Sequence, residues 1–389
     1  MTDIKSFEVI HTITSPYRIH MFNIMNEILM SKGINFHVNF MSDVTSHRPA
    51  DWSASSQSMH FSHDFWNDKG LKLFGNKWHF NPGILKHILK NKMDYLLIGG
   101  PWASITTLTS SFIAKSKTRK IAWIEGNAST ITAKQLRTLY IKKMVLNKFD
   151  FCAVPGIRGI EYVNRITNNS YPANHILKLP NIINEEMFDL TEESSQINIV
   201  EIANKANIDL SPSTKIALIP ARLIPEKGIL EFFTHIDTSM LTNWQIIIAG
   251  KGPLKNNILS LINSRNLNSH VKIIDPVNYV DMPILYKLSD LFIIPSVKDN
   301  NPLTLIEALH SNLPILASNK IGNYPEAIQD GINGWSLNPL DANSIQSASY
   351  SAFSSSKQKL QLMGAKSKDI AKKNWNSKEA LETFLNAAI

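Results

Sequence analysis

The chain has 389 residues, of which 43% are hydrophobic and 19% are charged, and this composition excludes a disordered protein. The length suffices for two domains with separate cores. The single cysteine, Cys152, excludes an intramolecular disulfide and fits a reducing compartment. The first residues lack a signal-peptide pattern, and no run approaches the ~20 apolar residues of a membrane-spanning helix. We therefore expect a cytoplasmic protein, with peripheral contact at the inner face of the plasma membrane left open.

Charge is distributed unevenly along the chain. Residues 1–180 contain 22 Lys and Arg against 11 Asp and Glu, a net charge of +11, whereas the remaining residues carry −3. Such asymmetry indicates that the first half meets something anionic, namely a membrane surface, an anionic lipid carrier or nucleic acid. A lysine-rich solvated surface accounts for the same count equally well.

The first half alternates short apolar runs with amphipathic stretches. Between its first two runs, the apolar residues from Ile19 to Leu29 recur at helical spacing, and Gly33 is a suitable stop. Strands are predicted at residues 7–13, 35–41, 93–99, 120–125 and 150–155.

The second half repeats this scheme. Its runs are apolar throughout, which is typical of strands buried on both faces, and their alternation with helices predicts parallel sheets covered on both sides. The expected fold class is α/β, with two Rossmann-like domains facing a central cleft. Strands are predicted at residues 215–221, 244–250, 271–276, 290–296 and 313–318.

The boundary between the domains is predicted close to residue 180. The first domain then covers 1–180 and the second 181–372, and a helix over 373–389 is expected to pack back on the first domain. The polar stretch 191–214 indicates an insertion or a mobile lead-in. Ligands of open parallel sheets bind beyond the carboxyl ends of the strands, so the strand-to-helix loops are the expected location of a site.

Gly250 and Gly252 form a G-x-G-P turn before a helix expected near Pro253. Glycines let backbone N–H groups approach a phosphate at a helix N-terminus, although a simple tight turn uses the same residues. Lys255 stands where G-x-G-x-x-G requires its third glycine, and the P-loop pattern is absent. A nicotinamide cofactor and an ordinary NTPase are therefore disfavoured.

Arg222 and Lys227 lie five positions apart in the loop after the strand 215–221. Arginine offers a planar fork of donors and lysine a point charge, a combination that suits a diphosphate. Two surface cations near Glu226 explain the spacing equally well.

A further loop-to-helix segment is SVKDNNPLTLIEAL, residues 296–309. Asn300 or Asn301 suits the N-cap and Pro302 the first turn, so a helix N-terminus that favours phosphate is expected there. Asp299 lies just outside this end and Glu307 about a turn and a half inside it.

The two carboxylates each suit a polyol, because a carboxylate accepts two hydroxyl hydrogen bonds at once. One acid then fits a ribose and the other a sugar ring. The commoner alternative is an N-terminal acid with a surface glutamate. The apolar neighbours of Glu307 in LTLIEAL weaken that alternative.

Three segments, PARLIPEKGILEFF, IIAGKGPL and DLFIIPSVKDNNPLTLIEALHSNLPILASNKIGNYPEAIQDGINGW, together resemble the donor domain of family-4 retaining glycosyltransferases with the GT-B fold. The likeness covers roughly residues 181–335. In that family the arginine and lysine of an R-x4-K-G loop bind the nucleotide diphosphate, and they match Arg222 and Lys227. An E-x7-E motif supplies two acids: the second, matching Glu307, holds the ribose, and the first, matching Asp299, approaches the transferred sugar.

The resemblance implies that the backbone of Asn300, Asn301, Pro302 and Leu303 meets the sugar and the distal phosphate. It also implies a nucleotide-sugar-binding second domain and an acceptor-binding first domain. The first acid of the motif is an aspartate here, one methylene shorter than the usual glutamate, so the identity of the donor sugar stays open.

The first half is similar to the family only in outline. The family's glycine-rich first loop is replaced by TITSPYRIHMF, whose Ser15, Tyr17 and Arg18 are candidates for an acceptor or phosphate loop. Glu125 in KIAWIEGNAS falls where many members place a histidine near the reacting sugar, and a structural carboxylate is the alternative.

The resemblance implies a retaining hexosyltransferase that moves a sugar from a nucleoside-diphosphate donor, a UDP-sugar above all, to a glycan or lipid-diphosphate-linked acceptor. Capsule, O-antigen or lipopolysaccharide-core assembly is the implied pathway. Asp299, Glu125, Arg222 and Lys227 are the implied catalytic residues. No D-x-D motif is present, so we expect no metal and no other cofactor, with the two cations and the helix end stabilising the leaving diphosphate.

Two other functions remain open at this point. One is a nucleotide-sugar 2-epimerase of the same fold, which requires an acid–base pair that the sequence does not reveal. The other is a non-catalytic sugar- or nucleic-acid-binding protein. The chain has no basic stripe interleaved with aromatic residues, so we expect no nucleic-acid partner.

Overall fold

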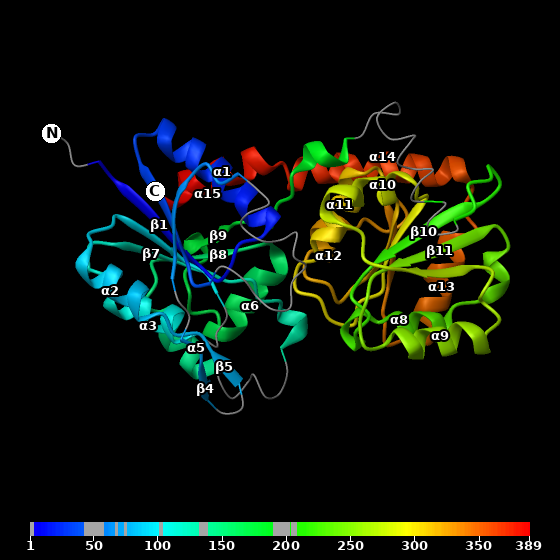
Figure 1. Ribbon diagram of the computed structural model, residues 1–389, viewed down its shortest axis with the longest axis horizontal. Helices are drawn as coiled ribbons and strands as arrows, with labels where there is room; N and C mark the ends of the chain where they lie inside the picture. The colour runs from blue at the N-terminus through cyan, green and yellow to red at the C-terminus, as the bar shows by residue number, and fades with distance from the viewer. Residues whose placement is uncertain are drawn as a thin grey trace. The chain divides into compact units, whose positions relative to one another are not determined.

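A computed structural model describes residues 4–42, 58–66, 69–73, 76–100, 104–131, 139–189, 203 and 208–389. The chain divides into two compact units (Figure 1), of which the first comprises Met1–Ile183 with Ser377–Ile389 and the second Asn184–Asn376. The predicted boundary at residue 180 is thus displaced to Ile183. Most of the predicted insertion 191–214 lies outside the described residues.

The first unit is built on a parallel sheet with the strand order β3-β2-β1-β6-β7-β8-β9. A short antiparallel hairpin, β4 (Leu71–Leu73) with β5 (Asn76–Trp78), forms a separate sheet. The strands of the main sheet are β1 (Ser6–His11), β2 (Asn35–Phe40), β3 (Ser62–Phe65), β6 (Tyr95–Ile98), β7 (Arg119–Trp123), β8 (Phe151–Val154) and β9 (Ile176–Lys178).

Helices cover both faces of this sheet (Figure 1). On one face α1 and α15 pack on a core that includes Phe7 and Phe22. On the other, α2, α3, α5 and α6 pack on a core that includes Ile10 and Val163. The helices are α1 (Pro16–Ser31), α2 (Pro82–Lys90), α3 (Ile105–Ile113), α5 (Leu139–Leu146), α6 (Ile157–Thr167) and α15 (Ser377–Ala388).

The last helix begins later than the sequence predicts. Residue 373, the predicted start, lies inside α14, which runs to Asn374 in the second unit. The chain turns at Trp375, and α15 begins at Ser377, whose hydroxyl donates a hydrogen bond to the carbonyl oxygen of Ile183 at 2.9 Å. Leu381 and Phe384 of α15 are fully buried in the core of the first unit.

The second unit contains a six-stranded parallel sheet with the order β12-β11-β10-β13-β14-β15. This is the doubly wound Rossmann order, whose direction of winding reverses between the first and fourth strands, here β10 and β13. The predicted α/β fold is confirmed in both units. The strands are β10 (Lys215–Pro220), β11 (Trp244–Ala249), β12 (Val271–Ile274), β13 (Leu291–Ile294), β14 (Ile315–Ser318) and β15 (Gly334–Leu337).

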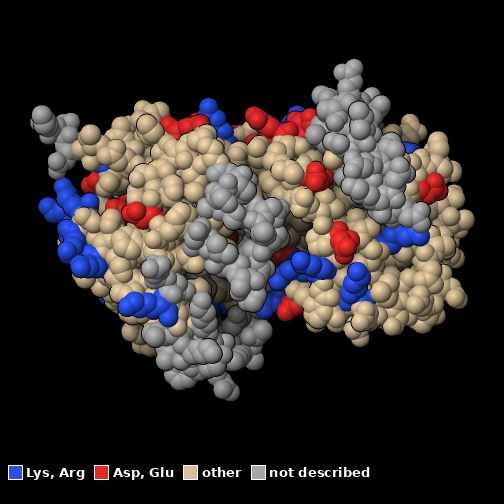
Figure 2. All heavy atoms as spheres, in the orientation of Figure 1, with Lys and Arg blue, Asp and Glu red and all other residues tan. Residues whose placement is uncertain are grey.

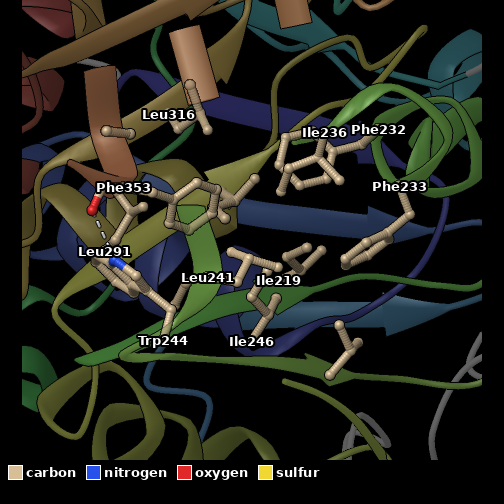
Figure 3. Close-up of a cluster of buried hydrophobic side chains, with 14 of the residues drawn as sticks. Ile219, Phe232, Phe233, Ile236, Leu241, Trp244, Ile246, Leu291, Leu316 and Phe353 are labelled. Atoms are coloured by element: carbon tan, nitrogen blue, oxygen red, sulfur yellow. Dashed lines mark hydrogen bonds between the residues drawn. The ribbon is translucent and has the colours of Figure 1, made fainter. Parts of the chain in front are cut away.

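A large apolar core lies beneath one face of this second sheet (Figure 3). Ile219 and Ile246 from the strands and Phe232 of α8 belong to this core. The Trp244 indole N–H donates to the carbonyl oxygen of Phe353 at 2.9 Å, which satisfies its only polar atom. The helices of this unit are α8 (Ile229–His235), α9 (Lys255–Ser264), α10 (Met282–Lys287), α11 (Leu303–His310), α12 (Tyr324–Ala327), α13 (Ala342–Phe353) and α14 (Lys357–Asn374).

The surface shows part of the charge asymmetry. On the face drawn in Figure 2, Lys and Arg side chains gather along the margin of the first unit beside α2. Among the helices of the described residues, none combines the length and the apolar character that a bilayer crossing requires. Cys152 is buried in β8, and burial raises the pKa of its thiol to about 12, so the thiol stays protonated at neutral pH.

Candidate functional site

The loops after β10 and β13 lie side by side because their strands are neighbours in the sheet. The backbone N–H of Lys298 donates to the carbonyl oxygen of Glu226 at 3.1 Å. Gly228 has a φ of +65°, and a Cβ there would stand 2.2 Å from the carbonyl oxygen of Pro295. Only glycine fits this position, so the loop with the two predicted cations packs directly on the loop that leads to Asp299.

Lys227 and Asp299 form an ion pair in which Nζ lies 2.5 Å from Oδ2. Their side chains are 19% and 17% exposed, so the pair is largely withdrawn from water. The sequence assigned Lys227 to the phosphates and Asp299 to the sugar as separate contacts. The structure places them together, beside the start of α11.

Arg222 is the first residue of this loop to project from the sheet edge. Its side chain is exposed, and within the described part of the chain no hydrogen bond or ion pair to it is observed. Its carbonyl oxygen accepts from the N–H of Ile224 at 2.9 Å, which fixes the backbone beneath it. The guanidinium is therefore accessible to an anionic ligand.

The N-terminus of α11 differs from the prediction. The helix begins at Leu303 with Pro302 in the N-cap position, and no side chain caps it, so neither Asn300 nor Asn301 is the N-cap. Proline supplies no side-chain acceptor, and the first backbone N–H groups of the helix are left without a capping side chain. The amide of Asn323 donates to the carbonyl oxygen of Pro302 at 3.0 Å and holds this end in place.

Gly322 allows the loop after β14 to close on the Asp299 loop. Its N–H donates to the carbonyl oxygen of Asp299 at 3.1 Å. A Cβ at this position would stand 1.5 Å from the carbonyl oxygen of Asn300. Such a contact is impossible without movement of the backbone.

We expect Gly322→Ala to lower the free energy of unfolding by about 3 kcal/mol, because the added methyl group must displace backbone. Gly331→Ala is the matched control: its φ is +74° but no atom lies within 4 Å of the added carbon, so it should cost only ~1 kcal/mol. Urea unfolding of both variants measures the difference. Equal losses would show that the close approach to Asn300 is not rigid.

Glu307 is only 1% exposed, in agreement with its apolar sequence neighbours. The hydroxyl of Tyr286, on α10, donates to its Oε2 at 2.6 Å. Burial, and then the negative charge of Glu307, raise the pKa of Tyr279, so this phenol stays protonated as well. A buried carboxylate oriented by a tyrosine presents a fixed geometry to a hydroxyl-bearing ligand.

We expect Tyr286→Phe to raise the KM for a nucleotide-sugar about tenfold with little change in kcat, because a hydrogen bond to a charged group is lost and the carboxylate is less well oriented. Donor titration and initial-rate kinetics measure both constants. Tyr350→Phe, at a 57% exposed tyrosine of α13, is the control. An unchanged KM in Tyr286→Phe would remove this tyrosine from the site.

The glycines of the G-x-G-P turn have a packing role. A Cβ on Gly250 would stand 1.9 Å from the carbonyl oxygen of Ala221, and one on Gly252 would stand 2.4 Å from that of Leu223. The turn therefore lies directly against the loop that carries Arg222. The following helix, α9, begins at Lys255, two residues after Pro253, close to the predicted start. A phosphate contact of this turn stays a prediction.

In the first unit, the loop after β1 leads into α1. Ser15 is the N-cap, and its Oγ accepts from the N–H of Arg18 at 3.3 Å. Arg18 forms an ion pair with Glu125, which follows β7, and its guanidinium carbon lies 4.3 Å from the ring centroid of Trp123. Tyr17 is half-buried in the first turn. The predicted loop residues and Glu125 thus belong to one cluster at the strand ends.

The electrostatics of this cluster keep Glu125 ionised. Desolvation by its surroundings raises the pKa of the carboxyl, but the charges of Arg18 and His11, with hydrogen bonds from Arg18 and Asn181, outweigh it and hold the pKa below its ordinary value. Glu125 is 44% exposed and therefore open to a ligand. A carboxylate with a lowered pKa is a poor proton acceptor, so it suits positioning better than acid–base catalysis.

In the described segments no group of three or more His, Cys, Asp and Glu side chains is placed to hold a metal ion. Metal independence stays a prediction. Tyr286, Tyr279, Gly322 and Asn323 were not identified from the sequence, because each acts through a partner that only the folded chain brings near.

Residues 201–369 match the family model of glycosyl transferases group 1. An uncharacterized glycosyltransferase of Methanocaldococcus jannaschii is 26% identical over 45% of this chain and 44% of its own length. The UDP-Gal:alpha-D-GlcNAc-diphosphoundecaprenol alpha-1,3-galactosyltransferase of Escherichia coli is 28% identical over 35% of each chain. The present chain thus aligns with less than half of either protein.

Solved structures match over nearly the whole chain. The crystal structure of Anabaena HepE in complex with UDP and glucose has a TM-score of 0.73 and 13% identity, and the match covers 98% of both chains. A glycosyltransferase from Rickettsia africae has a TM-score of 0.72 and 16% identity, covering 99% of this chain and 98% of its own. The chain therefore has the GT-B fold of glycosyltransferases, and the greater part of its second unit matches glycosyl transferases group 1.

Proposed function

We propose that the chain is a retaining glycosyltransferase that takes a sugar from a UDP-sugar and transfers it to a glycan or lipid-diphosphate-linked acceptor in surface polysaccharide assembly. The observation that carries the proposal is the grouping of Arg222, Lys227, Asp299 and Glu307 around the N-terminus of α11. These residues lie at the point where the winding of the sheet reverses, which is where nucleotides bind in doubly wound sheets.

Each part of this group suits one part of a nucleotide-sugar. Glu307, fixed by Tyr286, accepts hydrogen bonds from the ribose hydroxyls. Arg222, Lys227 and the uncapped N–H groups of α11 neutralise the diphosphate. Asp299 reaches toward the sugar. The pair that it forms with Lys227 fixes the position of both side chains.

The proposed reaction needs no base from the protein. The bond between the sugar C1 and the β-phosphate oxygen breaks, and the acceptor oxygen bonds to C1 on the same face. The acceptor proton passes to the departing phosphate oxygen. The cations and the helix end stabilise the charge that develops on the diphosphate. Glu125 is held ionised beside Arg18, and the family resemblance is what suggests a positioning role for it on the acceptor side.

The relatives support the choice of donor and acceptor. The Escherichia coli relative is named for a UDP-linked galactose and a diphosphoundecaprenol-linked acceptor, and HepE was crystallised with UDP and glucose. The aspartate at position 299 leaves the donor sugar to be found by experiment.

A hydrolysis screen over a panel of UDP-, GDP-, ADP- and dTDP-sugars tests the proposal. We expect release of UDP from one sugar above the rest, and retention of configuration in the product when a lipid-diphosphate acceptor is added. A donor epimerised without acceptor would contradict transfer and favour an epimerase. Binding of no nucleotide-sugar would reject both functions.

A further inference from the structure

The helix α5 exposes an apolar stripe that the proposed donor site does not explain. Tyr140, Ile141 and Met144 are 74%, 59% and 50% exposed. Their spacing places them on one side of the helix. No other helix in the described ranges exposes three large apolar side chains. Phe112 of α3 is 55% exposed as well, and Nζ of Lys148, in the turn after α5, lies 5.8 Å from its ring centroid.

The orientation of α5 is fixed from its opposite side. Val145 and Leu146 are buried in the core of the first unit. Lys142 is also buried, and its Nζ donates to the hydroxyl of Tyr162 on α6 at 3.0 Å. The helix cannot turn its apolar side inward without breaking these contacts. We call Tyr140, Ile141, Met144 and Phe112 the α5 stripe.

Charge identifies the surface that this stripe meets. Residues 126–149 contain five Lys and Arg and no Asp or Glu. Two of the lysines, Lys143 and Lys148, belong to α5 and the turn that follows it, and Lys148 borders the α5 stripe. Exposed apolar side chains with lysines beside them are typical of helices that lie in the interface of an anionic membrane.

We propose that the α5 stripe docks the first unit on an anionic lipid bilayer, with its apolar side chains among the acyl chains and Lys143 and Lys148 at the headgroups. This inference rests on the proposed function in one respect: a lipid-diphosphate acceptor is presented at such a surface. The contact is peripheral. An enzyme that acts on a water-soluble glycan would have no need of such a membrane-binding surface.

Sedimentation with lipid vesicles tests the proposal. The full chain should bind vesicles of phosphatidylcholine mixed with phosphatidylglycerol, and bind vesicles of phosphatidylcholine alone far more weakly. The triple variant Tyr140→Ser/Ile141→Ser/Met144→Ser should lose about a hundredfold in affinity, because the apolar area available for insertion is removed. Lys143→Gln/Lys148→Gln should lose about fivefold per lysine and reduce the salt dependence.

The matched control is Leu340→Ser/Tyr350→Ser/Leu362→Ser, which removes three side chains of the second unit that are 69%, 57% and 65% exposed. It should bind vesicles like the unaltered chain. Loss of binding in both triple variants, or in neither, would overturn the proposal. Failure of the unaltered chain to bind vesicles, or its association with itself through the α5 stripe instead, would overturn it as well.

Hydrolysis of a water-soluble donor separates this proposal from the proposed function. The stripe variant should hydrolyse the free donor as the unaltered chain does, because α5 carries none of the donor-binding residues. Donor hydrolysis without vesicle binding would reject membrane docking alone. Vesicle binding without activity on any nucleotide-sugar would reject the proposed function and leave the docking surface intact.

Discussion

Glu307→Ala is expected to abolish sugar transfer while the protein stays folded. The carboxylate is buried and oriented by Tyr286. In the proposed function it accepts two hydrogen bonds from the ribose, and its removal deletes both. At about 1.5–3 kcal/mol each, these correspond to a loss of about 10²- to 10⁴-fold in kcat/KM. Initial rates with the preferred donor, and donor binding by calorimetry, measure the loss.

Stability must be measured alongside, because the alanine removes the nearer acceptor of the Tyr286 hydroxyl and leaves only the carbonyl oxygen of Thr304 at 3.3 Å. A cost of about 1 kcal/mol is expected from the weakened hydrogen bond. Glu307→Gln keeps the side-chain volume and an acceptor oxygen for Tyr286, so it should unfold close to the unaltered chain and still lose most activity. Near-normal turnover in Glu307→Gln would contradict the proposal that Glu307 binds the ribose.

Arg222→Ala and Lys227→Ala are expected to reduce kcat by about 10²- to 10³-fold each, since the proposed function assigns both cations to the charge that develops on the leaving diphosphate. Their effects on stability should differ. Arg222 is exposed, so its loss should leave the unfolding midpoint unchanged. Loss of Lys227 leaves the carboxylate of Asp299 without its ion-pair partner in a site only 17% exposed.

The double variant Lys227→Ala/Asp299→Ala separates structure from catalysis. Removal of both charges should raise the free energy of unfolding above that of Lys227→Ala, because no unpaired carboxylate is left. It should not restore activity. Lys298→Ala is the matched control, because Lys298 is an exposed cation of the neighbouring loop and directly precedes Asp299. Its kinetics should be those of the unaltered chain. If Lys298→Ala lost as much kcat as Lys227→Ala, the net charge of the two adjoining loops would matter and the position of Lys227 would not.

Sequence patterns predicted the strands of both sheets best where they are buried on both faces. All five predicted strands of the second half are present, since fully apolar runs leave few alternatives. The missed strands lack that signal. β3 reads SHDF and is largely exposed, β9 has three residues, and β15 begins with Gly334, whose Cβ would stand 2.0 Å from the carbonyl oxygen of Ile315.

The candidate donor residues could be placed near one another from the sequence, because motif spacing puts them in strand-to-helix loops that a parallel sheet brings to one edge. Spacing could not reveal that Lys227 pairs with Asp299, because that contact depends on the close approach of two loops at Gly228. The prediction of the N-cap of α11 was wrong for a related reason. Asn300 and Asn301 are good capping residues by propensity, but Pro302 is the residue that enters the helix from an extended conformation.

The return of α15 to the first unit has a consequence for the order in which the chain folds. The core beneath α1 includes Leu381, Phe384 and Leu385, and these residues leave the ribosome after the whole of the second unit. The second unit is continuous from Asn184 to Asn376, so it can complete its core first, although domains generally fold from the N-terminus. During synthesis the apolar surface that α15 later covers stays exposed on the first unit. Chaperone binding at that stage should therefore be directed to the region of α1.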